Sequence, residues 1–482
     1  MRVNGVFGDH MVLQRDEEVV IWGVGEVGEP VGVSFGGTRV EAKIGGDGKW
    51  QVELGAMAAS GEGRELVVKS GDTERVFKDV VVGDVWHASG QSNMGMTLNS
   101  VAGRLEQGKV DIAAAALPGI RFRRSAAGPS DVALDDLGGG GWSVCSPSSA
   151  GGYSAAAFYF ARRVHAEVGV PVGVIDSSRG GTPIEPFIPR AAFVGHPTLE
   201  KEGMLGDAGD LRGIFLLEGG VQARDANWLP GRLFNSRVAP LARFVTRGMI
   251  WYQAESNCGR QEDPRDYAVK MRALISGWRR ALGDEGLPVY YVQLPGGGAG
   301  PGWPYMREQQ RLVARDPKVG MAVTIDLLDT DIHPANKIDV GERLARWALA
   351  EAYAKGGVRA GPLFRELDFR GGGVVVVGFD HVGSGLMVAR KEGLEAVEEV
   401  EGLELSLFEV ADGSGAWHAA EAVVRGDEVE VRSGAVAEPV AVRYGYAVSP
   451  VTCHLYNREG LPAAPFCSDV GLLDYDPGLP EE

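Results

Sequence analysis

The feature that most constrains this chain is an alternation, between Val80 and Lys355, of short apolar runs with longer amphipathic stretches. The apolar runs are typical of strands buried on both faces, and the stretches between them have the spacing of helices. Such an alternation predicts a parallel sheet covered by helices on both sides, a three-layer α/β domain over about residues 84–357. The predicted strands are Val80–Trp86, Val170–Ile175, Gly248–Tyr252, Pro288–Val292 and Gly320–Ile325, and the predicted helices are Ala155–Val168, Tyr267–Leu282 and Val340–Lys355.

On both sides of this region the sequence changes to short strand-like runs separated by Gly- and Pro-containing turns. With 482 residues the chain exceeds the size at which one core stops growing, so additional domains are expected. Short strands without intervening helices are typical of β-sandwiches, which we predict over about residues 1–83 and 358–482. The runs include Val19–Trp22, Val31–Ser34 and Leu66–Lys69 near the start, and Gly373–Gly378, Leu403–Phe408 and Glu428–Arg432 near the end.

The charge balance excludes one class of partner. The formal net charge is -17, from 65 acidic and 48 basic side chains, and no run rich in Lys or Arg interrupts the chain. Nucleic-acid binding is therefore not expected. The same charge would repel a negatively charged sugar at long range, so such a substrate would need a local basic pocket.

Membrane insertion is not expected either, because no apolar run approaches the length of a membrane span. The first residues read as a strand and not as a signal peptide. Since a signal could have been trimmed, the compartment stays open between cytoplasmic and periplasmic or secreted, and so does the oligomeric state. The four cysteines have no metal-ligand spacing, and free thiols are favoured over a Cys453–Cys467 disulfide.

Two sequence segments have residues suited to nucleophilic catalysis. Ser92 lies in Gly90–Met94, at the carboxyl end of a predicted strand, which is where active sites gather in open α/β sheets. His333 lies in Asp331–Pro334, between a predicted strand and a predicted helix, and a histidine there can accept a serine proton if a carboxylate such as Asp331 fixes its tautomer. The structural alternatives are a turn serine and a loop or helix-capping histidine.

Two further segments at strand ends offer groups for an oxyanion hole. Ser177–Pro183 contains the Gly180-Gly181 turn, and the Gly181 amide could donate to a developing oxyanion. Trp251–Asn257 contains Gln253 and Asn257, either of which could supply a side-chain amide, or could instead satisfy loop carbonyls. The joint occurrence of all four segments at strand ends in one α/β domain favours a hydrolase.

These segments also resemble those of a known family. Gly90–Met94, Gly180–Thr182, Trp251–Asn257 and Asp331–Pro334 are similar to segments of the sialate O-acetylesterases and related bacterial acetylesterases. The resemblance continues into both flanking regions, with Asp9–Arg15 near the start and Leu455–Ala463 near the end, and covers nearly the whole chain. It implies an SGNH-hydrolase-type central domain with a parallel sheet, flanked by β-sandwich-like domains.

The resemblance also implies roles for single residues. Ser92 matches the nucleophile, His333 the base and Asp331 the orienting acid, although Asp326 and Asp329 are open alternatives for the acid. Gly181 and the Ser92 amide match oxyanion donors, with Gln253, which we favour, or Asn257 as the side-chain donor. Neither a metal nor an organic cofactor is required.

Three positions depart from the family pattern. Ala254 stands where glycine is usual, Arg179 where tryptophan is common, and Glu185–Phe187 replaces a segment that often ends in tryptophan. The last two border the expected pocket, so Arg179 is a candidate for substrate binding, for example of a sugar carboxylate through a bidentate contact. Its structural alternative is an ion pair with Glu185.

The expected reaction is two-step acyl transfer in which Ser92 removes an acetyl group from a carbohydrate, most simply an O-acetylated sialic acid. Two alternatives stay open. One is an esterase acting on acetylated xylan or another polysaccharide. The other is a carbohydrate-binding protein with a vestigial hydrolase domain, against which the presence of both Ser92 and His333 argues.

Overall fold

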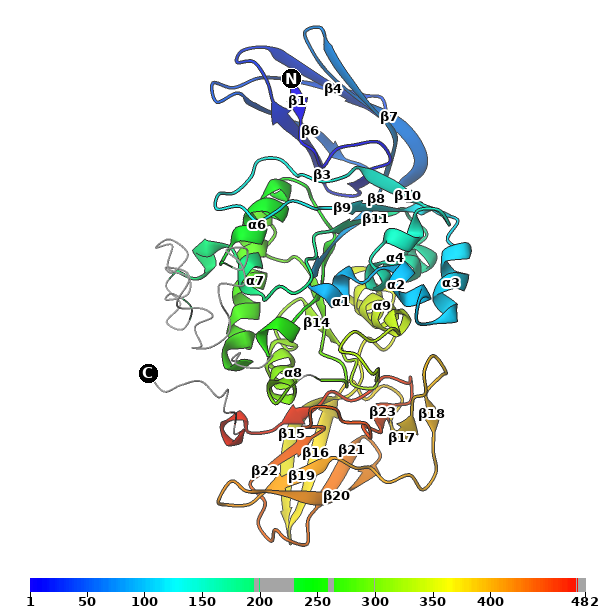
Figure 1. Ribbon diagram of the computed structural model, residues 1–482, viewed down its shortest axis with the longest axis vertical. Helices are drawn as coiled ribbons and strands as arrows, with labels where there is room; N and C mark the ends of the chain where they lie inside the picture. The colour runs from blue at the N-terminus through cyan, green and yellow to red at the C-terminus, as the bar shows by residue number, and fades with distance from the viewer. Residues whose placement is uncertain (195–198, 200–228, 259–263, 299, 474, 476–482) are drawn as a thin grey trace. The chain divides into compact units, whose positions relative to one another are not determined.

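The computed structural model describes residues 1–194, 199, 229–258, 264–298, 300–473 and 475 (Figure 1). The chain divides into two compact units. Of the described residues, the first comprises 1–194, 199, 229–251 and 272–289, and the second comprises 252–258, 264–271, 290–298, 300–473 and 475.

The central sheet of the first unit has the strand order β10-β9-β11-β8-β12. The strands β9, β11 and β8 are mutually parallel, and β11 is buried along its whole length, as its continuous apolar sequence predicts. The bounds are Thr73–Gly90 for β8, Leu117–Arg124 for β9, Trp142–Cys145 for β10, Val172–Asp176 for β11 and Gly248–Tyr252 for β12.

The sheet is mixed, which corrects the expectation of a parallel sheet. At its edge β10 runs antiparallel to β9. Among the described residues 125–141, which join these two strands, there is no helix. A parallel neighbour needs a crossover connection, whereas a strand that returns directly pairs antiparallel.

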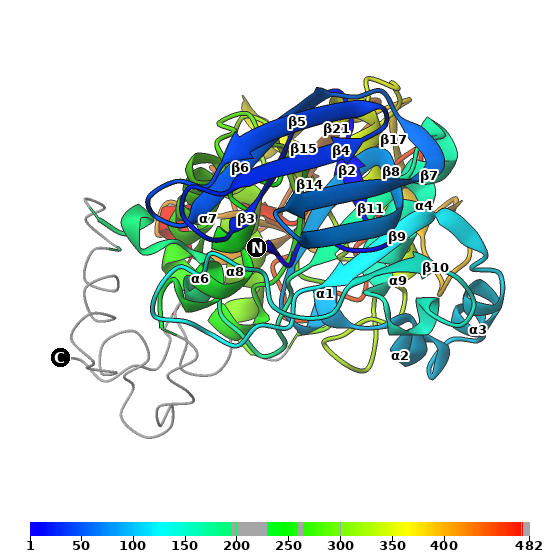
Figure 2. The same ribbon diagram turned by 90° about the horizontal axis from the view of Figure 1, so that it is seen from above.

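Two helices, α4 and α7, begin and end at the residues that the sequence predicts. The helix α4 spans Ala155–Val168, because the Ser154 side chain accepts a hydrogen bond from the Ala157 amide and Gly169 ends the helix in a left-handed conformation. It packs against β9 and β11 (Figure 2). Among its described residues this unit also contains the α-helices α1 (Ser92–Gly95), α2 (Leu98–Ala102), α3 (Glu106–Ala113) and α6 (Arg232–Arg237), and the part of α7 (Tyr267–Leu282) from residue 272 onward.

The amino-terminal part of the first unit is made of strands that share a core with the central sheet. The first half of β8 pairs antiparallel with β7, and its second half belongs to the α/β sheet, so this strand spans the predicted boundary at residue 83. One hydrophobic cluster contains Trp22 and Trp50 together with Val85 and Ile175. The other strands here are β1 (Arg2–Val3), β2 (Val12–Gln14), β3 (Glu18–Val24), β4 (Pro30–Phe35), β5 (Thr38–Lys43), β6 (Lys49–Ala56) and β7 (Ser60–Ser70).

The second unit contains helices and a β-rich carboxyl-terminal region. Its helix α9 spans Lys337–Trp347 and begins before the predicted Val340, because the Asn336 side chain accepts a hydrogen bond from the Asp339 amide. A π-helical turn, Ala348–Ala352, continues it. The other central elements are β13 (Val289–Val292), most of which lies in this unit, α8 (Gly302–Val313) and β14 (Val319–Ala322).

The carboxyl-terminal strands form two sheets, with the orders β15-β16-β21-β20-β19-β22-β24 and β18-β17-β23. The predicted strand Leu403–Phe408 is wrong except for its last residue, because Leu407 has φ 66° and a left-handed residue interrupts an extended chain. The strands are β15 (Leu363–Gly371), β16 (Val374–Asp380), β17 (Leu386–Arg390), β18 (Glu398–Glu399), β19 (Phe408–Ala411), β20 (Trp417–Arg425), β21 (Glu428–Arg432), β22 (Ala441–Tyr444), β23 (Leu455–Asn457) and β24 (Phe466–Cys467).

Two further expectations concern the whole chain. All four cysteines are free and buried, which confirms the expectation of free thiols. Within the described ranges, no helix has both the length and the apolar character that a membrane span requires.

Candidate active site

Ser92 lies where the chain passes from a buried strand into a short helix. Strand β8 ends at Gly90, whose φ of 135° is a conformation that favours glycine, and α1 begins at Ser92. The turn is closed by a hydrogen bond from the Gly95 amide to the Gln91 carbonyl, 2.9 Å long. Ser92 is half-buried at the carboxyl end of a parallel strand, the position that the sequence predicted for it.

The Gly180-Gly181 turn runs beside this serine. After β11 the chain continues along the end of β8, with hydrogen bonds of 2.9 Å from the Ser177 amide to Ala88 and from the Arg179 amide to Gly90. A Cβ atom added to Gly180 would lie 3.7 Å from the Cβ of Ser92, and Gly181 has φ 64°. The first unit thus brings together Ser92, Arg179 and Gly181, three of the residues singled out in the sequence.

Three buried residues that the sequence did not single out hold this turn. Asp176 accepts a hydrogen bond from the Ser178 amide at 2.9 Å, and its burial raises the pKa of the carboxyl. Arg237 of α6 donates to the carbonyls of Ser177 at 3.1 Å and Ser178 at 2.7 Å. His87 lies 2.7 Å from the Ser177 hydroxyl, and complete burial lowers the pKa of its ring to about 3, so the ring is neutral.

His333 and Asp331 contact each other within the second unit. The Asp331 carboxylate lies 3.0 Å from Nδ1 of His333, and the side chains are 52% and 28% exposed. Since Nδ1 faces a carboxylate, it carries the proton in the neutral ring, and Nε2 is then the nitrogen able to accept one. The sequence analysis predicted this pairing. In the structure both residues follow the carboxyl end of β14.

The two alternative carboxylates bond to other groups. Asp326 is buried and forms a bidentate ion pair with Arg343, with distances of 2.6 and 2.8 Å. Asp329 accepts hydrogen bonds from the amides of Thr330 at 2.7 Å and Ala335 at 3.0 Å. Asp326 therefore anchors α9, and Asp329 shapes the turn that contains His333.

Gln253 and Asn257 are joined by a hydrogen bond in the loop after β12. Nε2 of Gln253 donates to Oδ1 of Asn257 at 2.9 Å, and Oε1 of Gln253 accepts from the Tyr267 hydroxyl at 2.8 Å. Both amides are buried in the second unit. The bond at Oδ1 fixes the orientation of the Asn257 side chain, whose donor is its amide nitrogen, Nδ2.

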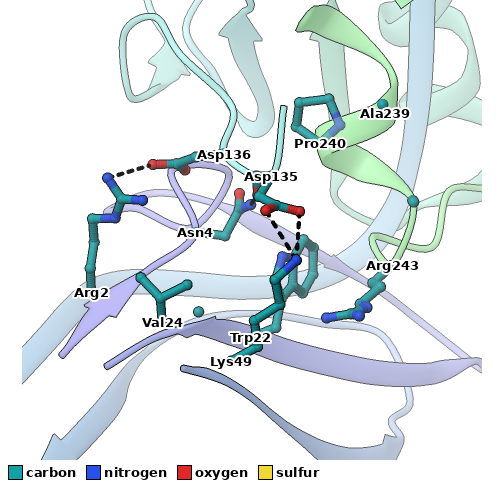
Figure 3. A pocket seen from close by; sticks show the side chains of 12 residues that line it. Arg2, Asn4, Trp22, Val24, Lys49, Asp135, Asp136, Ala239, Pro240 and Arg243 are labelled. Atoms are coloured by element: carbon teal, nitrogen blue, oxygen red, sulfur yellow. Dashed lines mark hydrogen bonds and ion pairs between the residues drawn. The ribbon is translucent and has the colours of Figure 1, made fainter. Parts of the chain in front are cut away.

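Two cavities, one in each unit, are lined by other residues. The first, of about 140 Å³, lies against β3 and contains the ion pairs Lys49–Asp135 and Arg2–Asp136 (Figure 3). The second, of about 490 Å³, lies at the amino ends of β13 and β14, whereas His333 follows the carboxyl end of β14. Neither is lined by a predicted site residue. In the described part of the chain, no group of three His, Cys, Asp or Glu side chains is placed to hold a metal ion.

This chain is similar to a family of carbohydrate esterases, to two mammalian sialate O-acetylesterases and to one solved bacterial structure. The family model described as carbohydrate esterase, sialic acid-specific acetylesterase, matches residues 82–350. Sialate O-acetylesterase of Rattus norvegicus is 29% identical over 418 residues, or 75% of each chain, and that of Pongo abelii is 27% identical and covers 99% of this chain and 94% of its own. A solved structure of a carbohydrate acetylesterase from Xanthomonas citri is 36% identical, covers 97% of this chain and 99% of its own, and has a TM-score of 0.84.

Proposed function

The chain belongs to the family of sialic acid-specific carbohydrate acetylesterases, and from this premise we propose that it is a serine esterase that removes O-acetyl groups from sialic acids. Family membership makes the chain a carboxylic ester hydrolase. The observation that carries the serine mechanism is the position of Ser92, at the end of β8 and against the backbone of the Gly180-Gly181 turn. Such a serine has peptide groups beside the place where a carbonyl oxygen would become negative.

In the proposed reaction the Ser92 hydroxyl attacks the acetyl carbonyl and passes its proton to Nε2 of His333. The imidazolium is stabilised by Asp331 at Nδ1 and then protonates the departing sugar oxygen. Water activated by the same histidine hydrolyses the acetyl-enzyme and regenerates the serine. The 3.0 Å contact between Asp331 and His333 supports these assignments.

The developing negative charge needs hydrogen-bond donors. We assign this role to the backbone amides of Ser92 and Gly181 and to one side-chain amide. We assign the side-chain donor to Nδ2 of Asn257, because the hydrogen bond from Gln253 orients the Asn257 amide, while Gln253 itself uses one Nε2 proton and its Oε1 in bonds to Asn257 and Tyr267. Gln253 is then the residue that positions Asn257. Each such donor is worth roughly 2.7–4 kcal/mol of barrier in enzymes of this type.

The proposal extends to the architecture. We propose that residues 84–357 form a three-layer SGNH-hydrolase-like domain and that residues 1–83 and 358–482 are its β-sandwich-like companions. The mixed sheet of the first unit and the β-rich end of the second are compatible with this division. Because β8 is continuous and one hydrophobic cluster spans the boundary, we expect the first two regions to unfold together.

Acetate release from defined substrates tests the function. We expect the enzyme to release acetate from an O-acetylated sialic acid faster than from acetylated xylan, and Ser92→Ala to abolish release from both while retaining the melting temperature of the unchanged protein. A preference for xylan would make the enzyme a polysaccharide esterase. Absence of turnover on every acetyl ester, with intact sugar binding, would leave a carbohydrate-binding protein.

A further inference from the structure

Arginines gather at the carboxyl ends of the strands next to Ser92. Arg124 is the last residue of β9 and lies directly opposite Asp176, the last residue of β11. Arg179 follows three residues later in the turn that contacts Gly90, and Arg237 reaches the same turn from α6. All four residues belong to the first unit.

The positive charge of this cluster exceeds its negative charge. Asp176 is the carboxylate within the cluster, it is buried, and its Oδ1 accepts the Ser178 amide. The Arg237 guanidinium is committed to the carbonyls of Ala127, Ser177 and Ser178. Three guanidinium groups therefore face one carboxylate in a protein whose net charge is -17.

Two of the three guanidinium groups have unused donors. Across the described residues, the Arg124 and Arg179 side chains show electrostatic interactions with Asp176 and Arg237 respectively but no hydrogen bond or ion pair, and the expected ion pair of Arg179 with Glu185 is absent. Arg124 is exposed and Arg179 is half-buried, so both are accessible. The pKa of Arg237 is lowered to about 10, mainly by burial and secondly by repulsion from Arg179. The two guanidinium groups are therefore close enough to repel each other.

The distance from the two arginines to Ser92 is comparable to the length of one sugar ring with its substituents. The strands β9, β11 and β8 are neighbours in this order, and Arg124 and Ala88 are level across β11, so these two residues are about 9.5 Å apart at the usual strand spacing. Arg179 lies between them, hydrogen-bonded through its amide to Gly90. One end of a monosaccharide can thus lie at Ser92 while a group at its other end reaches Arg124 and Arg179.

We propose that Arg124 and Arg179 together bind the carboxylate of an acidic sugar and so determine which acetylated sugars the enzyme prefers. Guanidinium groups bind carboxylates through paired hydrogen bonds, and here a bound anion also relieves the repulsion among the three arginines. The long-range repulsion from the acidic surface is offset locally by the same charges. This inference rests on the proposed function and assigns substrate binding to Arg124 as well as to Arg179.

Kinetics with matched substrates test the pair. The substrates are O-acetylated N-acetylneuraminic acid, its C1 carboxamide, which lacks the charge, and 4-nitrophenyl acetate. The variants are Arg124→Gln, Arg179→Gln and the double substitution. The control is Arg75→Gln, at an exposed position near the beginning of β8, which makes the same change in net charge.

We expect each single variant to lower kcat/KM for the acidic sugar by about 10- to 100-fold, the range for hydrogen bonds to a charged group. The carboxamide and 4-nitrophenyl acetate should be hydrolysed at unchanged rates, and Arg75→Gln should behave as the unchanged enzyme. Equal losses on all three substrates, or no loss on the acidic sugar, would overturn the inference.

A binding experiment separates this inference from the proposed function. Calorimetry measures the binding of N-acetylneuraminic acid, the product that lacks the O-acetyl group, to the unchanged protein and to both arginine variants. It requires no turnover. Binding that is lost in the variants supports the pair even if no ester is hydrolysed, and binding that is equal in all three proteins overturns it. Failure of the unchanged protein to hydrolyse any acetyl ester would instead overturn the proposed function.

Discussion

The acidic residues before His333 differ in what they contact, and this difference is the basis for proposing Asp331 as the orienting acid. The three carboxylates of this segment have different partners: Asp331 contacts the imidazole, Asp326 pairs with Arg343, and Asp329 accepts backbone amides. Sequence spacing could not distinguish them, because a separation of two, four or seven residues in a loop does not fix which side chain turns toward the ring. The assignment depends on the loop conformation, which the Asp329 hydrogen bonds define.

These partners predict different consequences of removing each charge. Asp331→Asn should lower kcat by at least about 100-fold with little change in melting temperature, because it removes the group that stabilises the imidazolium. Asp326→Asn should instead cost about 3–5 kcal/mol of stability, because it leaves Arg343 buried without its carboxylate. Turnover and thermal unfolding of the two variants provide the comparison. A greater loss of turnover in a stably folded Asp326→Asn protein would transfer the orienting role to Asp326.

His87 should make the protein sensitive to acid. Its folded pKa of about 3 lies below the ordinary value of 6.5, so between these pH values the unfolded chain binds a proton that the folded protein does not. The stabilisation is fully present above pH 6.5 and decreases as the pH falls, by about 2 kcal/mol between pH 7.5 and 5. His87→Gln, which keeps a polar partner for Ser177, should show a smaller decrease in urea unfolding experiments. An identical pH dependence in both proteins would contradict the neutral buried ring.

Among the elements, those with clear end signals were predictable. The bounds of α4 and β12 agree with the prediction to the residue, because Ser154 and Gly169 cap the helix and turns bound the apolar strand. The antiparallel edge strand β10 and the early start of α9 were not predictable. They depend on a connection without a helix and on the Asn336 cap, and neither changes the hydrophobic periodicity of the flanking sequence.

The loop after β12 contains an element-level test. Ala254 has φ 155°, within the range that favours glycine, at the position where the related family usually has glycine. Ala254→Gly should therefore stabilise the protein, by about 1 kcal/mol, whereas Ala345→Gly, at a buried position in the last turn of α9 before the π-helical turn, should destabilise it by at least that amount. Melting temperatures of the two variants measure the difference. A loss of stability in Ala254→Gly equal to that in Ala345→Gly would show that Ala254 is not strained.

At the scale of the whole molecule, the net charge of the chain is negative, whereas the side chains around Ser92 carry a local positive charge. The net charge of -17 disfavours the binding of polyanions, yet three arginines lie at the turn beside Ser92. Sequence reasoning identified Arg179, because it departs from a family pattern, but missed Arg124 and Arg237. They lie far from Ser92 in the sequence, and only the strand order β9-β11-β8 and the position of α6 bring them to it.

The central claim is that Ser92 is a nucleophile activated by His333, and labelling with a fluorophosphonate tests it most directly. We predict that mass spectrometry of the intact protein finds one phosphonyl group per chain and that peptide mapping locates it on Ser92. His333→Ala should slow the labelling by at least about 100-fold, since general-base assistance contributes that much or more, while Arg75→Gln should label normally. A protein that hydrolyses acetylated sugars but acquires no adduct on Ser92, or that labels equally fast without His333, would contradict the account.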